Sequence, residues 1–131
     1  MSKPLQSWKK LARAKDILIE PKGILVRFAD GRSHRVIVID EADHWILRCL
    51  IVRHADATFH PEPMLAAAIR NRQLRLCGLS VDKRGHLWGQ CMVPKAGLDA
   101  DEFQLCARHL AAECDRLEYL LTGRDREKSS R

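Results

Sequence analysis

The residues best able to do chemistry in this 131-residue chain are its six histidines, its five cysteines and several closely spaced carboxylates. His109 and Glu113 lie four residues apart in a segment with strong helical periodicity. Such a pair can place a general base beside a partner, or it can be an ordinary contact on a helix surface. We favour the surface contact because it is the simpler explanation.

Two short segments have residue types that can hold a metal ion. His54, Asp56 and His60 lie in an expected connector, but their spacing matches no recognised ligand pattern. Asp40 and its acidic neighbours lack the glycine and the terminal glutamate of a calcium-binding loop, so we interpret them as a solvated turn. We therefore predict no metal site and no cofactor.

The cysteines also point away from a metal centre. No two of them form a CxxC pair, and each lies among apolar residues, where a free thiol behaves as a small hydrophobic group. We expect reduced, mostly buried thiols in a cytoplasmic protein. The five positions are Cys49, Cys77, Cys91, Cys106 and Cys114.

Sequence signatures of common catalytic and nucleotide-binding sites are missing. The glycines form neither a GxGxxG nor a GxxxxGK[ST] series, and there is no GxSxG elbow around a serine. We therefore predict no catalytic residues and no enzymatic activity.

The composition indicates one soluble globular domain. Hydrophobic residues make up 46% of the chain, charged residues 31%, and the formal net charge is +6. Basic residues are spread among acidic ones rather than gathered in a stripe, which makes nucleic acid an unlikely partner. No run approaches the roughly 20 apolar residues of a membrane span, and the first residues lack a signal peptide pattern. We expect a single domain over residues 1–123 and a charged, disordered tail over 124–131.

Hydrophobic periodicity and turn signals predict an α+β fold in the order αβββαββα. Ser7 can cap a short helix over 7–16, and Asp30-Gly31 predicts a hairpin between two strands. Asp99 or Asp101 can cap a long C-terminal helix. We expect an antiparallel sheet with helices packed on one face. The expected strands cover 24–28, 35–39, 45–52, 74–82 and 86–93, with a middle helix beginning at Pro61 or Pro63 and the last helix over 98–121.

The first three strands predict two unlike sheet faces, because strand side chains alternate. One face is uniformly apolar and should lie beneath the first and last helices; it has Ile24, Val26, Phe28, Val36, Val38, Trp45, Leu47, Cys49 and Ile51. The other mixes guanidinium groups with large aliphatic side chains, and it is either a partner-binding surface or a partly covered second core layer. Its candidate partner-binding residues are Leu25, Arg27, Arg35, Ile37, Ile46 and Arg48.

The expected middle helix has a small apolar face. This face either packs within the chain or pairs two copies in a homodimer, the commonest oligomer. The candidate dimer interface consists of Met64, Leu65, Ala68 and Ile69.

Several local strings resemble the YbjN domain family, whose fold is similar to that of type III secretion chaperones of the CesT kind. The most specific string runs from Glu113 to Gly123, and others are Arg27–Arg32, Asn71-Arg72 and Val93-Pro94. Together they span about residues 5–124, and none is a catalytic motif. The resemblance implies a non-enzymatic, often dimeric protein that holds an extended client segment and pairs through its middle helix. Unlike the acidic secretion chaperones, this chain is basic.

Two functional hypotheses follow. The first is a non-enzymatic protein- or peptide-binding adaptor, chaperone-like and dimeric in the manner the resemblance implies. The second is a regulatory protein that binds nucleic acid through its basic surface. A steep loss of binding with salt would distinguish the second from the first.

Overall fold

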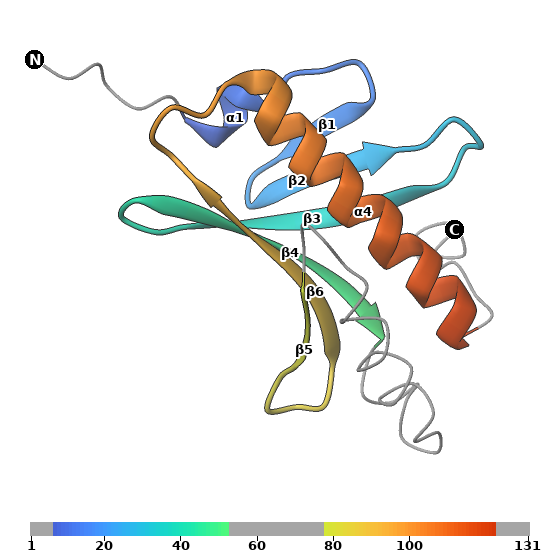
Figure 1. Cartoon of the computed structure of the whole chain (residues 1–131). Helices are drawn as coiled ribbons and strands as arrows, with labels where there is room; N and C mark the ends of the chain where they lie inside the picture. Colours follow the sequence, from blue (N-terminus) through green and yellow to red (C-terminus); the bar gives the residue numbers. More distant parts are fainter. Residues whose placement is uncertain (1–6, 53–77, 123–131) are drawn as a thin grey trace, which may run out of the picture.

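A computed structural model of the chain describes residues 7–52 and 78–122 (Figure 1). The predicted middle helix and the beginning of the predicted fourth strand lie outside the described residues. The described helices and strands are α1 (Trp8–Leu11), β1 (Ile17–Glu20), β2 (Gly23–Arg27), β3 (Ser33–Asp40), β4 (His44–Val52), β5 (Gly78–Val81), β6 (Leu87–Pro94) and α4 (Ala100–Thr122).

The strands form one six-stranded antiparallel sheet in the order β1-β2-β3-β4-β6-β5. α4 contacts β2, β3, β4 and β6, and α1 contacts α4, so both helices lie on the same side of the sheet (Figure 1). The α+β class and the single helix-covered face are therefore confirmed. None of the described helices is long and apolar enough to cross a membrane.

The N-terminal region differs from the prediction in two ways. The first helix ends at Leu11 instead of continuing to Asp16, and β1 is a strand that the sequence did not reveal. Ala12 caps the helix, and a bridge between Ala14 and Ile17 then turns the chain back. β1 is only four residues long, too short for a clear alternation, and its pairing with β2 is what makes it a strand.

Both predicted caps and the predicted hairpin are present. The Ser7 side chain accepts a hydrogen bond of 3.3 Å from the backbone N–H of Lys10. Asp99 likewise accepts one of 2.8 Å from the N–H of Glu102, at the beginning of α4. Gly31 takes a φ of +89° in the β2–β3 turn, a conformation that favours glycine.

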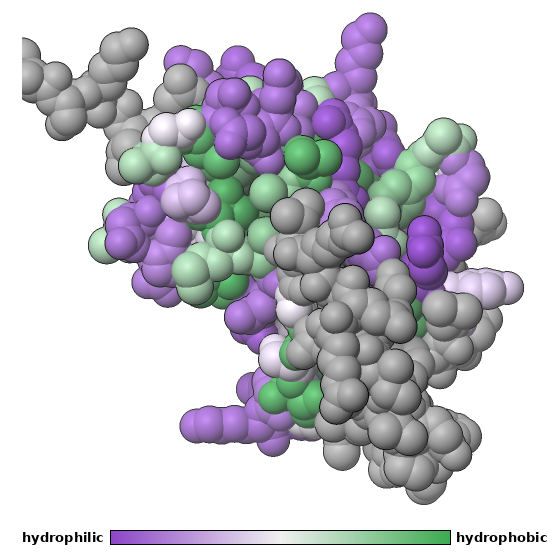
Figure 2. All heavy atoms as spheres, viewed as in Figure 1, coloured by the Kyte–Doolittle hydropathy of each residue, from purple (hydrophilic) through white to green (hydrophobic). Residues whose placement is uncertain are grey.

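The core lies between α4 and the helix-covered side of the sheet. Phe103, near the beginning of α4, meets Trp45 edge to face with ring centroids 5.7 Å apart. Figure 2 shows hydrophilic side chains over α1 and the first turns of α4, with hydrophobic ones toward the sheet. The buried positions of α4 are Phe103, Ala107, Leu110, Ala111, Cys114, Asp115, Leu117 and Glu118. Its apolar stripe was predicted, whereas its two buried carboxylates were not.

The described cysteines are free thiols. Cys49, Cys91 and Cys114 are buried, and Cys106 is half-buried. A hydrogen bond with Cys49, together with burial, raises the pKa of Cys114 well above its ordinary value. The Cys114 thiol is therefore a protonated packing group. The free and mostly buried thiols agree with the prediction, while Cys77 lies outside the described residues.

Gly89 on β6 allows α4 to approach the sheet closely. A Cβ atom at this position would collide with the Sγ of Cys114 and would lie 3.4 Å from Leu110 Cδ1 and 3.5 Å from Ile51 Cδ1. Any side chain here would push the helix away from the sheet.

We expect Gly89→Ala to lower the free energy of unfolding by about 1–3 kcal/mol, because it overpacks this contact. Urea denaturation followed by circular dichroism measures the change. Cys114→Ala in the same chain should restore part of the loss by making room. Gln90→Ala, at the neighbouring exposed position, is the control, and equal losses for both alanine variants would contradict the interpretation.

A surface ion pair connects α4 to the segment between α1 and β1. Arg108 donates two hydrogen bonds of 2.8 Å to the carboxylate of Asp16. Gln104 adds bonds of 2.9 and 3.1 Å to the carbonyls of Leu11 and Arg13. The hydrogen bonds from Arg108 hold the pKa of Asp16 below its ordinary value.

We expect Asp16→Asn to lower the free energy of unfolding by about 0.2–1 kcal/mol near neutral pH, the range for an exposed ion pair. A depressed carboxyl pKa stabilises the fold above the ordinary value of 3.8, and the contribution is lost as pH falls through the folded pKa. The gap between wild type and variant should therefore close below about pH 4 in urea titrations. Glu41→Gln, in an exposed turn, is the control. A gap that does not narrow as pH falls below 3.8 would contradict a charge-based contribution.

Candidate functional site

The sheet has an inner face beneath α1 and α4 and an outer face on the opposite side. No helix within residues 7–52 and 78–122 covers the outer face (Figure 1). Cross-strand partners share a face, so the registers assign its members. They include Leu18, Glu20, Leu25, Arg27, Arg35, Ile37, Ile39, Ile46, Arg48, Leu50, Trp88, Gln90 and Met92.

The six candidate partner-binding residues all lie on this outer face. Arg27, Arg35 and Ile37 are exposed, and Leu25, Ile46 and Arg48 are half-buried. The residues assigned to the inner face are buried, except Phe28, which is half-buried. The alternation of faces is therefore as predicted, and the binding role of the six residues stays a prediction.

Arg48 is a cation of the outer face that contacts an aromatic ring. Its guanidinium lies over the ring of Trp88, 4.3 Å from the centroid. Its Nε is buried and has no hydrogen-bond partner among the residues that the structure describes. A cation–π contact of this kind restricts the positions that the planar guanidinium can take. A carboxylate that reaches it thus meets a preordered donor.

The ring beneath Arg48 is itself held in place. Trp88 Nε1 donates a hydrogen bond of 2.9 Å to Asp82, in the β5–β6 turn. That bond, helped by the backbone N–H groups of Arg84 and His86, holds the pKa of Asp82 below its usual value. The turn therefore fixes Trp88, and Trp88 in turn fixes Arg48.

Arg35 differs from the other two arginines of the candidate site. Its Nε lies 3.2 Å from Glu20 Oε1, on the strand that the sequence did not reveal. The structure thus pairs Arg35 with a carboxylate of its own chain. Arg27 and Arg48 are better placed to receive a carboxylate from a partner.

Large apolar side chains surround these charges. Leu18 is 44% exposed, Ile37 41% and Met92 67%, high values for such residues. Leu18 pairs with Leu25 across β1 and β2, and Met92 pairs with Ile46 across β6 and β4. At the β1–β2 end, a hollow of about 360 Å³ is lined by Glu20, Pro21, Lys22, Gly23, Arg35, Val36 and Ile37. The outer face therefore combines aliphatic contact area, fixed cations and a concave end.

Sequence reasoning missed three large apolar residues of the outer face, Leu18, Trp88 and Met92. Leu18 lies on the unpredicted β1, so nothing signalled it. Trp88 and Met92 lie on a predicted strand, where alternation with the buried Leu87, Cys91 and Val93 would have placed them on the other side.

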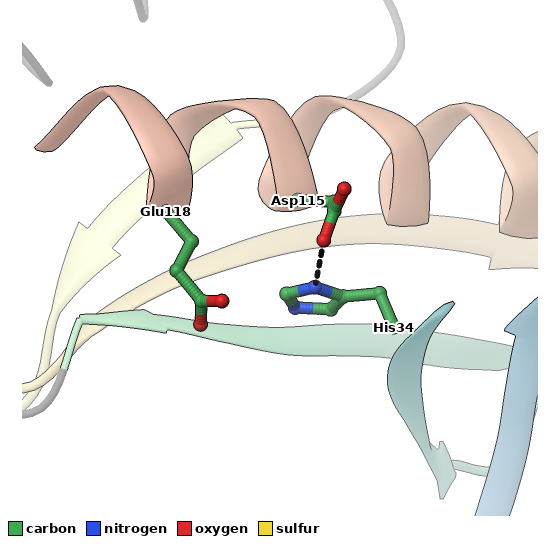
Figure 3. A group of neighbouring side chains, drawn as sticks. All are labelled: His34, Asp115 and Glu118. Carbon is green, nitrogen blue, oxygen red and sulfur yellow. Dashed lines mark ion pairs between the residues drawn. The ribbon is translucent and has the colours of Figure 1, made fainter. Parts of the chain in front are cut away.

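A second polar group lies on the inner side, between β3 and α4 (Figure 3). His34 Nδ1 is 3.5 Å from Asp115 Oδ1, and Arg32 Nη2 is 2.9 Å from Asp115 Oδ2. Glu118, one helical turn further along α4, is also buried. Burial alone would lower the pKa of His34, but Asp115, the Leu50 carbonyl and Glu118 outweigh it and raise that pKa. These neighbours therefore favour the protonated, positively charged form of the His34 imidazole.

Two predicted groups lie outside the described residues. They are the candidate dimer interface, Met64, Leu65, Ala68 and Ile69, and the histidines and aspartate of the connector, His54, Asp56 and His60.

The fold matches solved structures of type III secretion proteins. One is a chain of the heterodimeric complex ExoU–SpcU from Pseudomonas aeruginosa, with a TM-score of 0.59 and 14% identity over 82% of this chain and 83% of that one. Another is from the Yersinia pestis secretion chaperone SycH in complex with a stable fragment of YscM2, with a TM-score of 0.52 and 10% identity over 85% and 99%. These likenesses establish a secretion-chaperone-like fold.

No protein-family model matches the sequence, and the search of curated proteins found no significant relative.

Proposed function

We propose that this chain is a non-enzymatic, chaperone-like adaptor that binds an extended segment of a client protein on the outer face of its sheet. We further propose that it is YbjN-like, cytoplasmic and homodimeric. The observation that carries the binding role is the juxtaposition of aliphatic side chains with a guanidinium fixed on Trp88, on the face that the described helices leave uncovered.

The chemistry of the face suits an acidic, aliphatic client. A client carboxylate at Arg48 or Arg27 forms a charge-assisted hydrogen bond, worth about 1.5–3 kcal/mol. Apolar client side chains covering Leu25, Ile37 and Ile46 add about 25 cal/mol per Å² of buried area. An extended segment projects alternate side chains to one side, so acidic and aliphatic residues two apart can both reach the sheet.

The arginine and aliphatic side chains of the outer face are better suited to binding than to catalysis. Guanidinium groups stay protonated at all physiological pH values, so they orient carboxylates but cannot act as general bases. Aliphatic side chains contribute contact area only. The likeness to secretion-chaperone structures, solved in complexes with other proteins, supports the same choice.

The client chemistry can be tested with an array of extended peptides. Peptides that alternate Asp or Glu with Leu, Ile or Val should bind, and the same peptides with Lys or Arg in place of the acids should not. Arg27→Glu with Arg48→Glu should weaken binding at least about 100-fold, because two charge-assisted contacts become repulsive. Fluorescence anisotropy measures the affinity, and circular dichroism and thermal melts should change little.

A matched control keeps the net charge the same. Lys10→Glu with Lys15→Glu makes the same charge change at exposed positions outside the outer face, and it should leave peptide affinity unchanged. Equal losses in both double variants would mean that only overall charge matters. Tight binding of single-stranded RNA or DNA that falls steeply with salt, without peptide binding, would instead support the nucleic-acid alternative.

Homodimer formation can be tested separately. Ile69→Asp places a charge in the apolar segment proposed to pair two copies, so it should convert dimers into monomers in light scattering. Arg72→Glu, a charge change just beyond that segment, is the control. A wild-type chain that is monomeric at all concentrations would overturn the dimer proposal without affecting the binding face.

A further inference from the structure

The group formed by His34, Asp115 and Glu118 has the composition of a metal site. His34 projects from β3, and Asp115 and Glu118 project toward it from α4 (Figure 3). Their exposed fractions are 1%, 6% and 2%, and their nearest imidazole and carboxylate ligand atoms all lie within 4.8 Å of one another. Imidazole nitrogen and carboxylate oxygen are common ligands of first-row divalent ions.

The distance between the first two residues fits two ligands of one ion better than a direct hydrogen bond. His34 Nδ1 and Asp115 Oδ1 are 3.5 Å apart, and neither buried atom has a hydrogen-bond partner among the described residues. A charge-assisted N–H···O bond is normally about 2.7–2.9 Å long. Ligands bound at about 2.0–2.2 Å to one tetrahedral ion lie about 3.3–3.6 Å apart.

The imidazole is oriented as metal-binding histidines usually are. Its Nε2 lies 3.0 Å from the carbonyl oxygen of Leu50. A carbonyl only accepts, so Nε2 bears the proton and donates it. The remaining nitrogen, Nδ1, then has its lone pair directed toward Asp115 whenever the ring is neutral. A backbone carbonyl on the far nitrogen commonly fixes the tautomer of a ligating histidine.

The neighbouring guanidinium is compatible with a bound cation. Arg32 Nη2 contacts Oδ2 of Asp115 at 2.9 Å and leaves Oδ1 facing the imidazole. This ion pair lies at the second oxygen of the carboxylate, where ligating carboxylates commonly have an outer-shell partner. An open hollow of about 240 Å³ reaches Asp115, one of the three residues, from solvent; it is lined by Phe28, Asp30, Arg32, Ala112, Asp115, Arg116 and Tyr119.

We propose that His34, Asp115 and Glu118 bind a first-row divalent cation, with Zn²⁺ as the reference ion. The ion would join β3 to α4 and leave at least one coordination position for water. Metal binding goes beyond the proposed client binding, because its ligands lie on the inner side of the sheet.

The test is a titration of full-length, tag-free protein stripped with chelator. Zn²⁺ should bind one per chain by calorimetry and raise the melting temperature. Co²⁺ should give visible d–d bands without the near-ultraviolet charge transfer of a thiolate ligand. Glu118→Gln should weaken Zn²⁺ binding more than about 100-fold, beyond the effect of removing a group outside the coordination sphere. Glu102→Gln, the same change at an exposed site of α4, should not.

Nitrogen-detected NMR of the histidine side chains keeps the proposal testable if the buried variants fail to fold. Zn²⁺ should shift the Nδ1 resonance of His34 while Nε2 keeps its proton. Shifts confined to His44 or other histidines would show surface binding and overturn the proposal. Three other results would also overturn the proposal: thiolate charge transfer with Co²⁺, unchanged Zn²⁺ affinity in Glu118→Gln, or no saturable Zn²⁺ binding. In the last case His34, Asp115 and Arg32 form a metal-free charge network.

Discussion

The packing of α4 against the inner face of the sheet is the contact on which the rest of the described structure depends. It buries the apolar stripe of the helix, and burial of this kind is the main favourable term in folding. Gly89 allows the approach, and Phe103 fills the space beside Trp45. Because a sheet has only two faces, covering one of them with α4 and α1 determines what the other can do. No described helix covers the outer face, which is the surface that we propose for client binding.

The need for an apolar inner face also determines which residues lie on the outer face. Strand side chains alternate, so inner positions occupied by aliphatic and aromatic residues fix which residues point outward. Polar side chains alone would suffice for contact with water. Here Ile37 and Met92 are exposed instead, beside an arginine fixed on Trp88. Aliphatic area provides affinity and fixed cations provide selection, which is the combination that a binding surface for an acidic, apolar segment requires.

Polar contacts fasten α4 at two places along its length. Arg108 binds Asp16 near the N-terminal segment, at the surface, where an ion pair contributes little. Asp115 meets Arg32 and His34 in the interior, where removing one partner is far more costly. The interior contact therefore has the greater influence on where the C-terminal half of the helix lies. A divalent ion there would strengthen the same connection, on the opposite side of the sheet from the proposed client.

Local sequence patterns were enough to predict the long helix with its cap at Asp99, the hairpin at Gly31, the α+β class and the two faces of the central strands. Those features follow from periodicities and turn preferences that act over a few residues. Contacts between residues far apart in the chain became visible only in the folded protein. β1 is a strand because β2 is beside it, Glu20 reaches Arg35 through that pairing, and the carboxylates of α4 meet His34 only after the helix has packed on the sheet. Spacing along the chain contains no signal for such contacts, because the distance between their partners is set by packing.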